Sequence, residues 1–192
     1  MKQHFLLDPD ITFLNFGSFG ACNKKVFDYY HQLQYEFEYN PIQFMTSKGM
    51  HYLQKSREAL GAYIHCNMDD LVLVSNPTFA VNLIAKNLHL APGDEILATN
   101  IEYGACDKTW EYYCTQAQAK YVRQRITLPL ISEEQFVEDF FKGVTNKTKL
   151  IFLSHITSTT ALIFPVKKVI QRAKELGIKT FIDGAHVPGH IP

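Results

Sequence analysis

The chain has 192 residues, 46% of them hydrophobic, and its 19 Lys and Arg are balanced by 19 Asp and Glu. A neutral chain without a basic stripe is a poor partner for nucleic acid, and its aliphatic runs are too short to span a membrane. Its four cysteines form no CxxC pair and its N-terminus does not resemble a signal peptide, so we expect a cytoplasmic protein with reduced thiols.

The predicted elements begin with helices and continue as alternating strands and helices. The first third is rich in aromatic residues, with helices expected at Lys24–Tyr39 and at about 51–64. Beyond it, short aliphatic runs alternate with amphipathic stretches, which predicts parallel strands covered by helices on both faces. In chain order these are strand Leu71–Ser75, helix Thr78–Leu88, strand Glu95–Thr99, helix Gly104–Ala119, strand Tyr121–Ile126, a helix from Ser132 to about Lys142, strand Leu150–Ser154, helix Val166–Leu176 and strand Ile178–Ile182.

This order of elements predicts an α/β fold with three layers, αβα, around a mainly parallel sheet. We expect a helical N-terminal segment over 1–66 and an α/β domain over 67–192. A sheet that stops after its last predicted strand lacks neighbours at its edge, so we expect the domain to be the N-terminal part of a larger one.

Several predicted strands are followed by residues that could bind a ligand, and the carboxyl ends of parallel strands meet at one edge of a sheet. After the first strand, the Asn76-Pro77 pair is a good helix cap, which would leave the N–H groups of Thr78 and Phe79 free to bind a phosphate. After the second strand, Tyr103 could stack on a planar ligand. A capped helix without a ligand and an ordinary packed tyrosine are the alternatives at these positions.

The two later strand ends carry polar groups. His155 follows Ser154, but the two are neighbours on opposite sides of a strand and make a poor nucleophile–base pair. Asp183 follows the last strand and is the strongest candidate, because a carboxylate is costly to bury unless a cation or several donors meet it. The alternatives are a loop histidine and an aspartate that caps its own turn.

Taken together, these positions predict one ligand. A phosphate site, a stacking ring, polar groups and a carboxylate at one sheet edge suit a phosphorylated aromatic molecule with a protonatable nitrogen. Pyridoxal 5′-phosphate (PLP) fits this description, since its pyridine nitrogen needs an acidic partner that keeps the ring an electron sink.

From about Phe13 to its end, the chain resembles the class V aminotransferase family of fold-type I PLP enzymes, in the branch that contains isopenicillin N epimerase-like proteins and cysteine desulfurases. The resemblance rests on five segments in the family's order: LNFGSFGAC, Pro77-Thr78, IEYGA, LSHITS and FIDGAHVPG. It implies that this chain is the incomplete large domain of an enzyme acting at the α-carbon of an amino acid. Epimerisation or racemisation, transamination, and elimination with sulfur transfer are all reactions of this family, and the motif set favours an epimerase.

The resemblance also implies roles for individual residues. Thr78 and the Phe79 amide would hold the phosphate, Tyr103 would stack on the pyridine ring, and Asp183 would pair with its nitrogen. Asn76-Pro77 departs from the family pattern, because it stands where relatives commonly have a glycine-led turn.

Two histidines and several missing groups complete this comparison. His155 would lie near the ring, where many relatives have asparagine, and His186 would approach the ring hydroxyl, where relatives often have glutamine. The Schiff-base lysine and the arginine that binds the substrate carboxylate would lie downstream of Asp183, beyond the residues present, so we expect this chain alone to be inactive. Lys48, the nearest substitute, is expected to be an exposed loop lysine. Family members are usually homodimers.

Two other classes of function stay open. Asp183, His186 and His190 could bind iron or zinc, although Pro188-Gly189 prevents a helix from aligning the two histidines. The chain could also be a non-catalytic α/β module. A nucleotide-binding version is disfavoured because no GxGxxG or GxxxxGK[ST] segment follows any strand.

Overall fold

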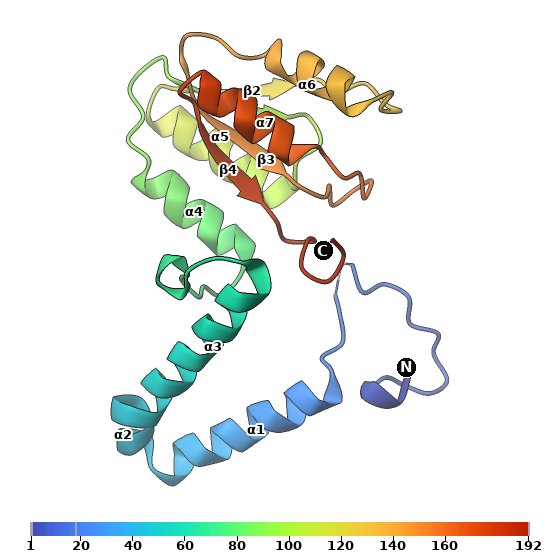
Figure 1. Cartoon of the computed structure of the whole chain (residues 1–192), viewed down its shortest axis with the longest axis vertical. Coiled ribbons are helices and arrows are strands. Elements are labelled where there is room, and N and C mark those ends of the chain that lie inside the picture. Colours follow the sequence, from blue (N-terminus) through green and yellow to red (C-terminus); the bar gives the residue numbers. More distant parts are fainter. Residues whose placement is uncertain (1, 18, 192) are drawn as a thin grey trace. The chain divides into compact units, whose positions relative to one another are not determined.

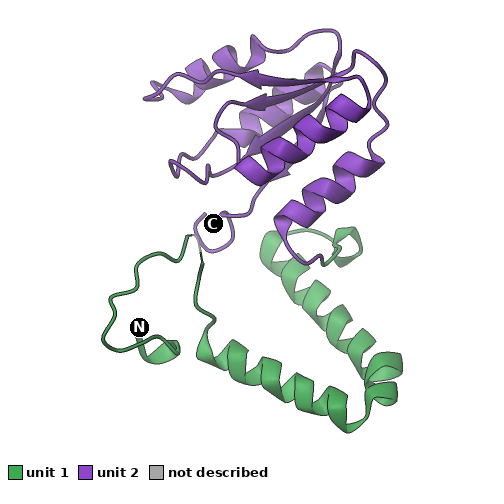
Figure 2. Cartoon of the chain, turned by 180° about the vertical axis from the view of Figure 1, so that it is seen from behind, with its two compact units in different colours: residues 1–73 green, residues 74–192 purple. Residues whose placement is uncertain are grey.

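The computed structural model describes residues 2–17 and 19–191, and the contacts within it group the chain into unit 1 (Met1–Leu73) and unit 2 (Val74–Pro192) (Figure 2). The sequence predicts this boundary a few residues earlier, between residues 66 and 67. Ser18 of the LNFGSFGAC segment and Pro192 at the end of the last motif lie outside the described residues.

Unit 1 is helical: α1 (Lys24–Tyr39) has the predicted bounds, and α3 (Gly49–Ile64) begins slightly before the predicted start at about residue 51. Between α1 and α3 the chain does not form a loop: it continues as a short helix and a π-helical turn. Gly61 is the single buried residue among the described residues of this unit, so the unit has no apolar core of its own. Its elements are η1 (Lys2–His4), α1 (Lys24–Tyr39), α2 (Pro41–Gln43), η2 (Phe44–Lys48), α3 (Gly49–Ile64) and η3 (Met68–Asp70).

The expectation that Lys48 is a loop lysine is wrong. Lys48 ends the π-helical turn η2, and its Nζ lies 2.6 Å from Oε1 of Glu36 on α1. The Tyr52 hydroxyl on α3 donates to the other oxygen of the same carboxylate, across 2.9 Å. This carboxylate therefore links α1, η2 and α3 of unit 1.

Unit 2 is an α/β domain built on a four-stranded sheet of order β2-β1-β3-β4, in which every pair of neighbours is parallel. This confirms the predicted fold class. The strands are β1 (Glu95–Thr99), β2 (Lys120–Gln124), β3 (Thr148–Ser154) and β4 (Lys179–Asp183), and the helices are α4 (Pro77–Asn87), α5 (Gly104–Gln116), α6 (Glu133–Phe141) and α7 (Val166–Glu175).

Two apolar clusters pack against the opposite faces of the sheet and make the predicted three layers. One joins Ile96 and Phe152 of the sheet to Trp110 of α5 and to residues of α4. The other joins Leu153 of the sheet to Phe136 of α6 and to residues of α7. Figure 1 shows α5 and α7 on opposite sides of the strands. Side chains alternate between the two clusters along β3, as the two-residue period of a strand requires.

The predicted strand Leu71–Ser75 is not a strand. Its residues join no ladder of the described sheet, and the side chain of Val72 is 79% exposed. A short aliphatic run satisfies the sequence pattern of a buried strand, but a strand also needs a neighbour for its backbone N–H and C=O groups. Here the run leads directly into α4.

The local signals that place the other elements are visible in the structure. The Ser132 hydroxyl accepts from the Gln135 amide at the start of α6, and Gly177 follows α7 with a φ of +69°, a conformation that suits glycine. No helix among the described residues is both long and apolar enough to cross a membrane.

Strand β4 is an edge strand, paired within the described residues only with β3. A hollow of about 560 Å³ lies along it, lined mainly by apolar side chains of α4, β4 and the end of α7, among them Ile84, Leu88, Ile170, Ile178 and Phe181.

Candidate functional site

The sheet order places a topological switch point between β1 and β3. The chain leaves β1 toward β2 on one side, and later returns to add β3 and β4 on the other side. Ligands of open α/β sheets bind in the crevice that such a reversal opens at the carboxyl ends of the strands. In this chain those ends carry Thr99, Ser154 and Asp183.

Asp183 is a buried carboxylate, 8% exposed, at the end of β4. Its Oδ1 accepts a hydrogen bond from the Ala185 amide at 3.0 Å, which is the turn cap considered as an alternative. Its Oδ2 meets the Cys106 thiol, a weak donor, at 3.7 Å. No cation of the described chain forms an ion pair with it. A buried charge with so few donors is costly, and a cationic ligand group would offset that cost.

Cys106, in the first turn of α5, connects two of the predicted site residues. Burial, and after it the negative charge of Asp183, raise the pKa of its thiol to about 12. The Thr78 side chain, at the start of α4, acts on the same thiol and lowers its pKa. Thr78 and Asp183 therefore both act on one buried thiol, which nothing in the sequence marks as part of the site.

The N-terminus of α4 differs in one respect from the prediction. Asn76 caps the helix as expected, but its side chain accepts from the Phe79 amide at 2.8 Å, so that amide is not free. The Thr78 amide has no acceptor among the described residues and remains a donor at the positive end of the helix. The part of the predicted phosphate site that the structure leaves open is thus Thr78.

Tyr103 is the N-cap residue of α5 and its side chain is 45% exposed, which leaves its ring free to cover a ligand. It follows a second buried carboxylate, Glu102, which is 8% exposed. In the IEYGA segment the tyrosine is the predicted site residue, and the glutamate before it is not among the predicted ones. The signal was present, because a charged residue soon after a buried strand is the same pattern that identified Asp183.

Glu102 joins the carboxyl ends of β1 and β3. Its Oε1 accepts from the Thr99 hydroxyl at 2.6 Å and the Thr99 amide at 3.3 Å. Its Oε2 accepts from the Ser154 hydroxyl at 2.6 Å and the Ser154 amide at 2.9 Å. Burial raises the pKa of the Glu102 carboxyl, and these four hydrogen bonds oppose the shift.

His155 does not lie with the side chains of this cluster. The Ser154 side chain points to Glu102, so the next residue faces the other side of the sheet, toward α7. Burial and the charge of Lys167 on α7 lower the pKa of the His155 imidazole. Its backbone amide does reach the site's edge, where it donates to the Asp183 carbonyl at 2.9 Å. A role for the His155 ring at a cofactor stays a prediction that this placement does not favour.

His186 lies half-buried after β4, and its carbonyl lies 2.6 Å from Nδ1 of His190. No group of three or more His, Cys, Asp or Glu side chains in the described part of the chain could hold a metal ion. Asp183, His186 and His190 thus do not gather into the metal site considered as an alternative.

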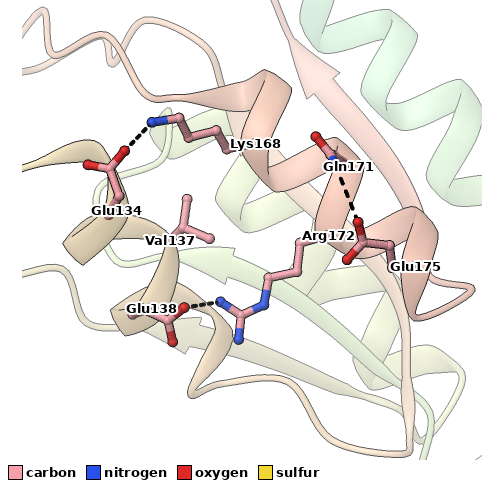
Figure 3. A pocket seen from close by; sticks show the side chains of 7 residues that line it. All are labelled: Glu134, Val137, Glu138, Lys168, Gln171, Arg172 and Glu175. Atoms are coloured by element: carbon pink, nitrogen blue, oxygen red, sulfur yellow. Dashed lines mark hydrogen bonds and ion pairs between the residues drawn. The ribbon is translucent and has the colours of Figure 1, made fainter.

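A separate hollow of about 350 Å³ between α6 and α7 is lined by charged side chains (Figure 3). Lys168 pairs with Glu133 and Glu134, and Arg172 with Glu138. Since each of these cations already has a carboxylate partner, the hollow is an ion-paired joint between two helices and offers no free cation for a ligand.

Comparison with known proteins gives concordant matches. The family model described as Aminotransferase class-V matches residues 23–192. An isopenicillin N epimerase from Amycolatopsis lactamdurans is 33% identical over 98% of this chain and 48% of its own length. A hercynylcysteine sulfoxide lyase from Schizosaccharomyces pombe is 27% identical over 100% of this chain and 49% of its own length. The chain spans about half the length of these curated relatives.

Among solved structures, a mutant of C-DES with glycine covalently linked to the PLP cofactor matches with a TM-score of 0.87. The match covers 96% of this chain and 49% of that chain at 19% identity. At this identity the likeness shows the fold, and it agrees with the parallel α/β architecture of unit 2.

Proposed function

The chain belongs to the class V aminotransferase family, and on that premise we propose that it binds pyridoxal 5′-phosphate at the carboxyl ends of β1, β3 and β4, in an enzyme acting at the α-carbon of an amino acid. The observation that carries the proposal is Asp183, a buried carboxylate with a backbone donor, a weak thiol donor and no cation partner in the described chain. A protonated pyridine nitrogen is the kind of partner that such a group lacks.

The other residues of the cluster suit the same molecule. Thr78 offers a free amide at a helix N-terminus for the phosphate, and the exposed ring of Tyr103 can cover the pyridine. PLP, when bound, withdraws electrons from a carbanion at the substrate's α-carbon. Asp183 would hold the proton on the pyridine nitrogen, and the Tyr103 ring would exclude water from one face. Roles for the His155 and His186 rings at the cofactor stay predictions.

For the reaction, we propose epimerisation of an amino acid, supported by the likeness to isopenicillin N epimerase. A carbon–sulfur lyase is the second candidate, supported by the likeness to hercynylcysteine sulfoxide lyase and to an L-cysteine desulfhydrase of Arabidopsis thaliana. The two differ in their products. Exchange of the α-hydrogen with solvent deuterium, without release of sulfide or a keto acid, supports epimerisation; release of a sulfur product supports the lyase.

We also propose that the enzyme is a homodimer in the cytoplasm. Support for the dimer comes from unit 1, whose described residues have almost no buried side chains and many exposed large apolar ones, among them Leu14, Phe19, Tyr35, Tyr39 and Ile42. Sedimentation equilibrium of the intact protein distinguishes a dimer from a monomer.

The test of the proposed cofactor uses the intact protein that contains this sequence. Titration with PLP should give a saturable change in the visible spectrum, and borohydride reduction followed by mass spectrometry should locate the modified lysine. Asp183→Asn keeps the shape of the side chain and removes its charge, so it should weaken PLP binding by about 10- to 100-fold, the range for losing a charged hydrogen bond. Asp139→Asn, at a carboxylate paired with Lys142 on α6, is the matched control and should bind normally. Equal binding by all three proteins would remove Asp183 from the site.

A further inference from the structure

Two buried carboxylates, Glu102 and Asp183, lie at the carboxyl edge of the sheet and differ in the number of hydrogen bonds that they accept. Glu102 and Asp183 are each 8% exposed. Glu102 accepts four hydrogen bonds, all from Thr99 and Ser154, whereas Asp183 accepts one from a backbone amide and one from a thiol. A carboxylate saturated by its own chain needs no ligand. Glu102 is therefore bonded only within the protein, whereas Asp183 can still bind a ligand.

The bonds of Glu102 span the topological switch point. Thr99 ends β1 and Ser154 ends β3, the two neighbouring strands between which the order of the sheet reverses. Each of these residues donates both its hydroxyl and its backbone amide to one oxygen of Glu102. One side chain thus fixes the separation of the two strand ends that border the crevice.

Both partners of this connection lead directly to a residue of the proposed site. Glu102 is followed in the chain by Tyr103, the N-cap residue of α5. Ser154 is the register partner of Asp183 across β3 and β4. Tyr103 and Asp183 are therefore connected in three steps. A peptide bond joins Tyr103 to Glu102, two hydrogen bonds join Glu102 to Ser154, and the pairing of β3 with β4 joins Ser154 to Asp183.

We propose that Glu102 is a positioning residue, which holds the Tyr103 ring at a fixed place relative to the Asp183 carboxylate. The inference rests on the proposed function, because it concerns the same site. Glu102 itself touches neither cofactor nor substrate: both of its oxygens are occupied by Thr99 and Ser154. Glu102 would preorganise the site: it would hold the Tyr103 ring and the Asp183 carboxylate in the arrangement that binds a flat, cationic ring.

The decisive variant is Glu102→Gln. This substitution keeps the size of the side chain but replaces one acceptor oxygen by an NH2 group. The NH2 group cannot accept a hydrogen bond, so the hydroxyl and amide of the residue that it faces, Thr99 or Ser154, lose their acceptor. We expect the affinity for PLP to fall about tenfold and the induced circular dichroism of the bound cofactor to change. In the cofactor-free protein, amide hydrogen exchange at residues 103–106 should become faster.

The matched control is Glu95→Gln. Glu95 is 7% exposed and lies at the amino end of the same strand β1, where it accepts from the Thr145 hydroxyl, away from the proposed site. This variant should lower thermal stability by a similar amount but leave PLP affinity and the exchange at 103–106 unchanged. Equal loss of PLP affinity in both variants would overturn the proposal, since it would show a general effect on the sheet.

A double-mutant cycle separates positioning of Tyr103 from other effects. In a Tyr103→Ala background, Glu102→Gln should cost little further affinity, because there is no ring left to place. An undiminished loss in that background would contradict the proposal. If Glu102→Gln fails to fold, Ser154→Ala removes one of the same hydrogen bonds and takes its place. Should the wild-type protein not bind PLP, the proposed function fails, while the exchange at 103–106 still decides the structural role of Glu102.

Discussion

The Cys106 thiol lies 3.7 Å from Oδ2 of Asp183, so a helix start and a strand end meet at a buried sulfur. Burial and this carboxylate raise the pKa of Cys106 to about 12, and burial raises that of Cys114 to about 11. Thiol reagents attack the thiolate, which these two residues form only at strongly alkaline pH.

We therefore expect a maleimide to label exposed Cys22 in the folded protein at neutral pH and to leave Cys106 and Cys114 unmodified. All three should react after unfolding in urea. Mass spectrometry of the digested protein measures each site. Rapid labelling of Cys106 in the folded state would show that the edge of the sheet is open to reagents and that the pKa of its thiol is not raised.

The second prediction concerns Gly61 in α3. Replacing a glycine inside a helix by alanine usually stabilises the helix by about 1 kcal/mol. Here a Cβ would lie 2.8 Å from the backbone carbonyl oxygen of Cys66 and 3.3 Å from the amide nitrogen of Met68. Since backbone atoms cannot give way cheaply, we expect Gly61→Ala to destabilise the end of α3.

Amide hydrogen exchange across residues 61–68 measures this effect, and faster exchange is the expected result. Gly104→Ala is the control for intrinsic helix propensity, because a Cβ at Gly104 would meet nothing within 4 Å. Slower exchange in Gly61→Ala would contradict the prediction, because it would mean that the backbone at Cys66 and Met68 can accommodate the added Cβ.

The third prediction separates packing from charge in the joint between α6 and α7. The Arg172 guanidinium lies 4.6 Å from the centre of the Phe141 ring and 2.7 Å from Oε1 of Glu138. Arg172→Ala should lower the free energy of unfolding by about 1 kcal/mol, because it removes a cation–π contact together with apolar packing. Lys168→Ala breaks exposed ion pairs alone and should have no measurable effect at physiological salt.

Urea unfolding at low and high salt measures both variants. Arg172→Lys keeps the charge but loses the planar group, so it should resemble Arg172→Ala. If the loss in Arg172→Ala disappears at high salt, its origin is electrostatic and the contact with Phe141 contributes little.

The fourth prediction concerns pH and the carboxylate of Glu36. Hydrogen bonds from Lys48 and Tyr52 lower the pKa of Glu36, and the same contact raises the pKa of Lys48 and of Tyr52. A lowered carboxyl pKa stabilises the folded state above the ordinary value of 4.5, and this contribution is lost as the pH falls below it. The link between α1 and α3 should therefore loosen in acid.

Glu36→Gln provides the measurement. It removes the negative charge, so the pKa of the Tyr52 phenol should fall toward the ordinary value of 10.0. Spectrophotometric titration of tyrosine detects this change, and Tyr52→Phe identifies the signal. An unchanged titration in Glu36→Gln would mean that the hydrogen bond between Tyr52 and Glu36 does not persist in solution.

Most of the fold could be predicted because its signals are local. Strand Glu95–Thr99 and helix Lys24–Tyr39 begin and end where the sequence predicts, and Ser132 acts as the expected start of α6. The segment 71–75 could not be read correctly, because whether an aliphatic run becomes a strand depends on a distant neighbour.

The candidate site was predicted less completely. The sequence singles out Asp183 because it is a carboxylate at the end of an apolar strand, and the structure shows that it is buried. Cys106 was missed because nothing in a helical cysteine indicates that it faces a carboxylate 77 residues away. The placement of His155 follows from the alternation that also separates it from Ser154, so the sequence did contain the reason why its ring faces away from Asp183.

The centre of strand β4, Thr180-Phe181-Ile182, consists of residues that favour strands, and the outer row of N–H and C=O groups of β4 has no ladder partner among the described residues. Such a row is a template on which another extended segment can add. When these 192 residues are produced on their own, we expect them to aggregate progressively with concentration, and a lysine or proline placed on the outer edge of β4 should delay the onset.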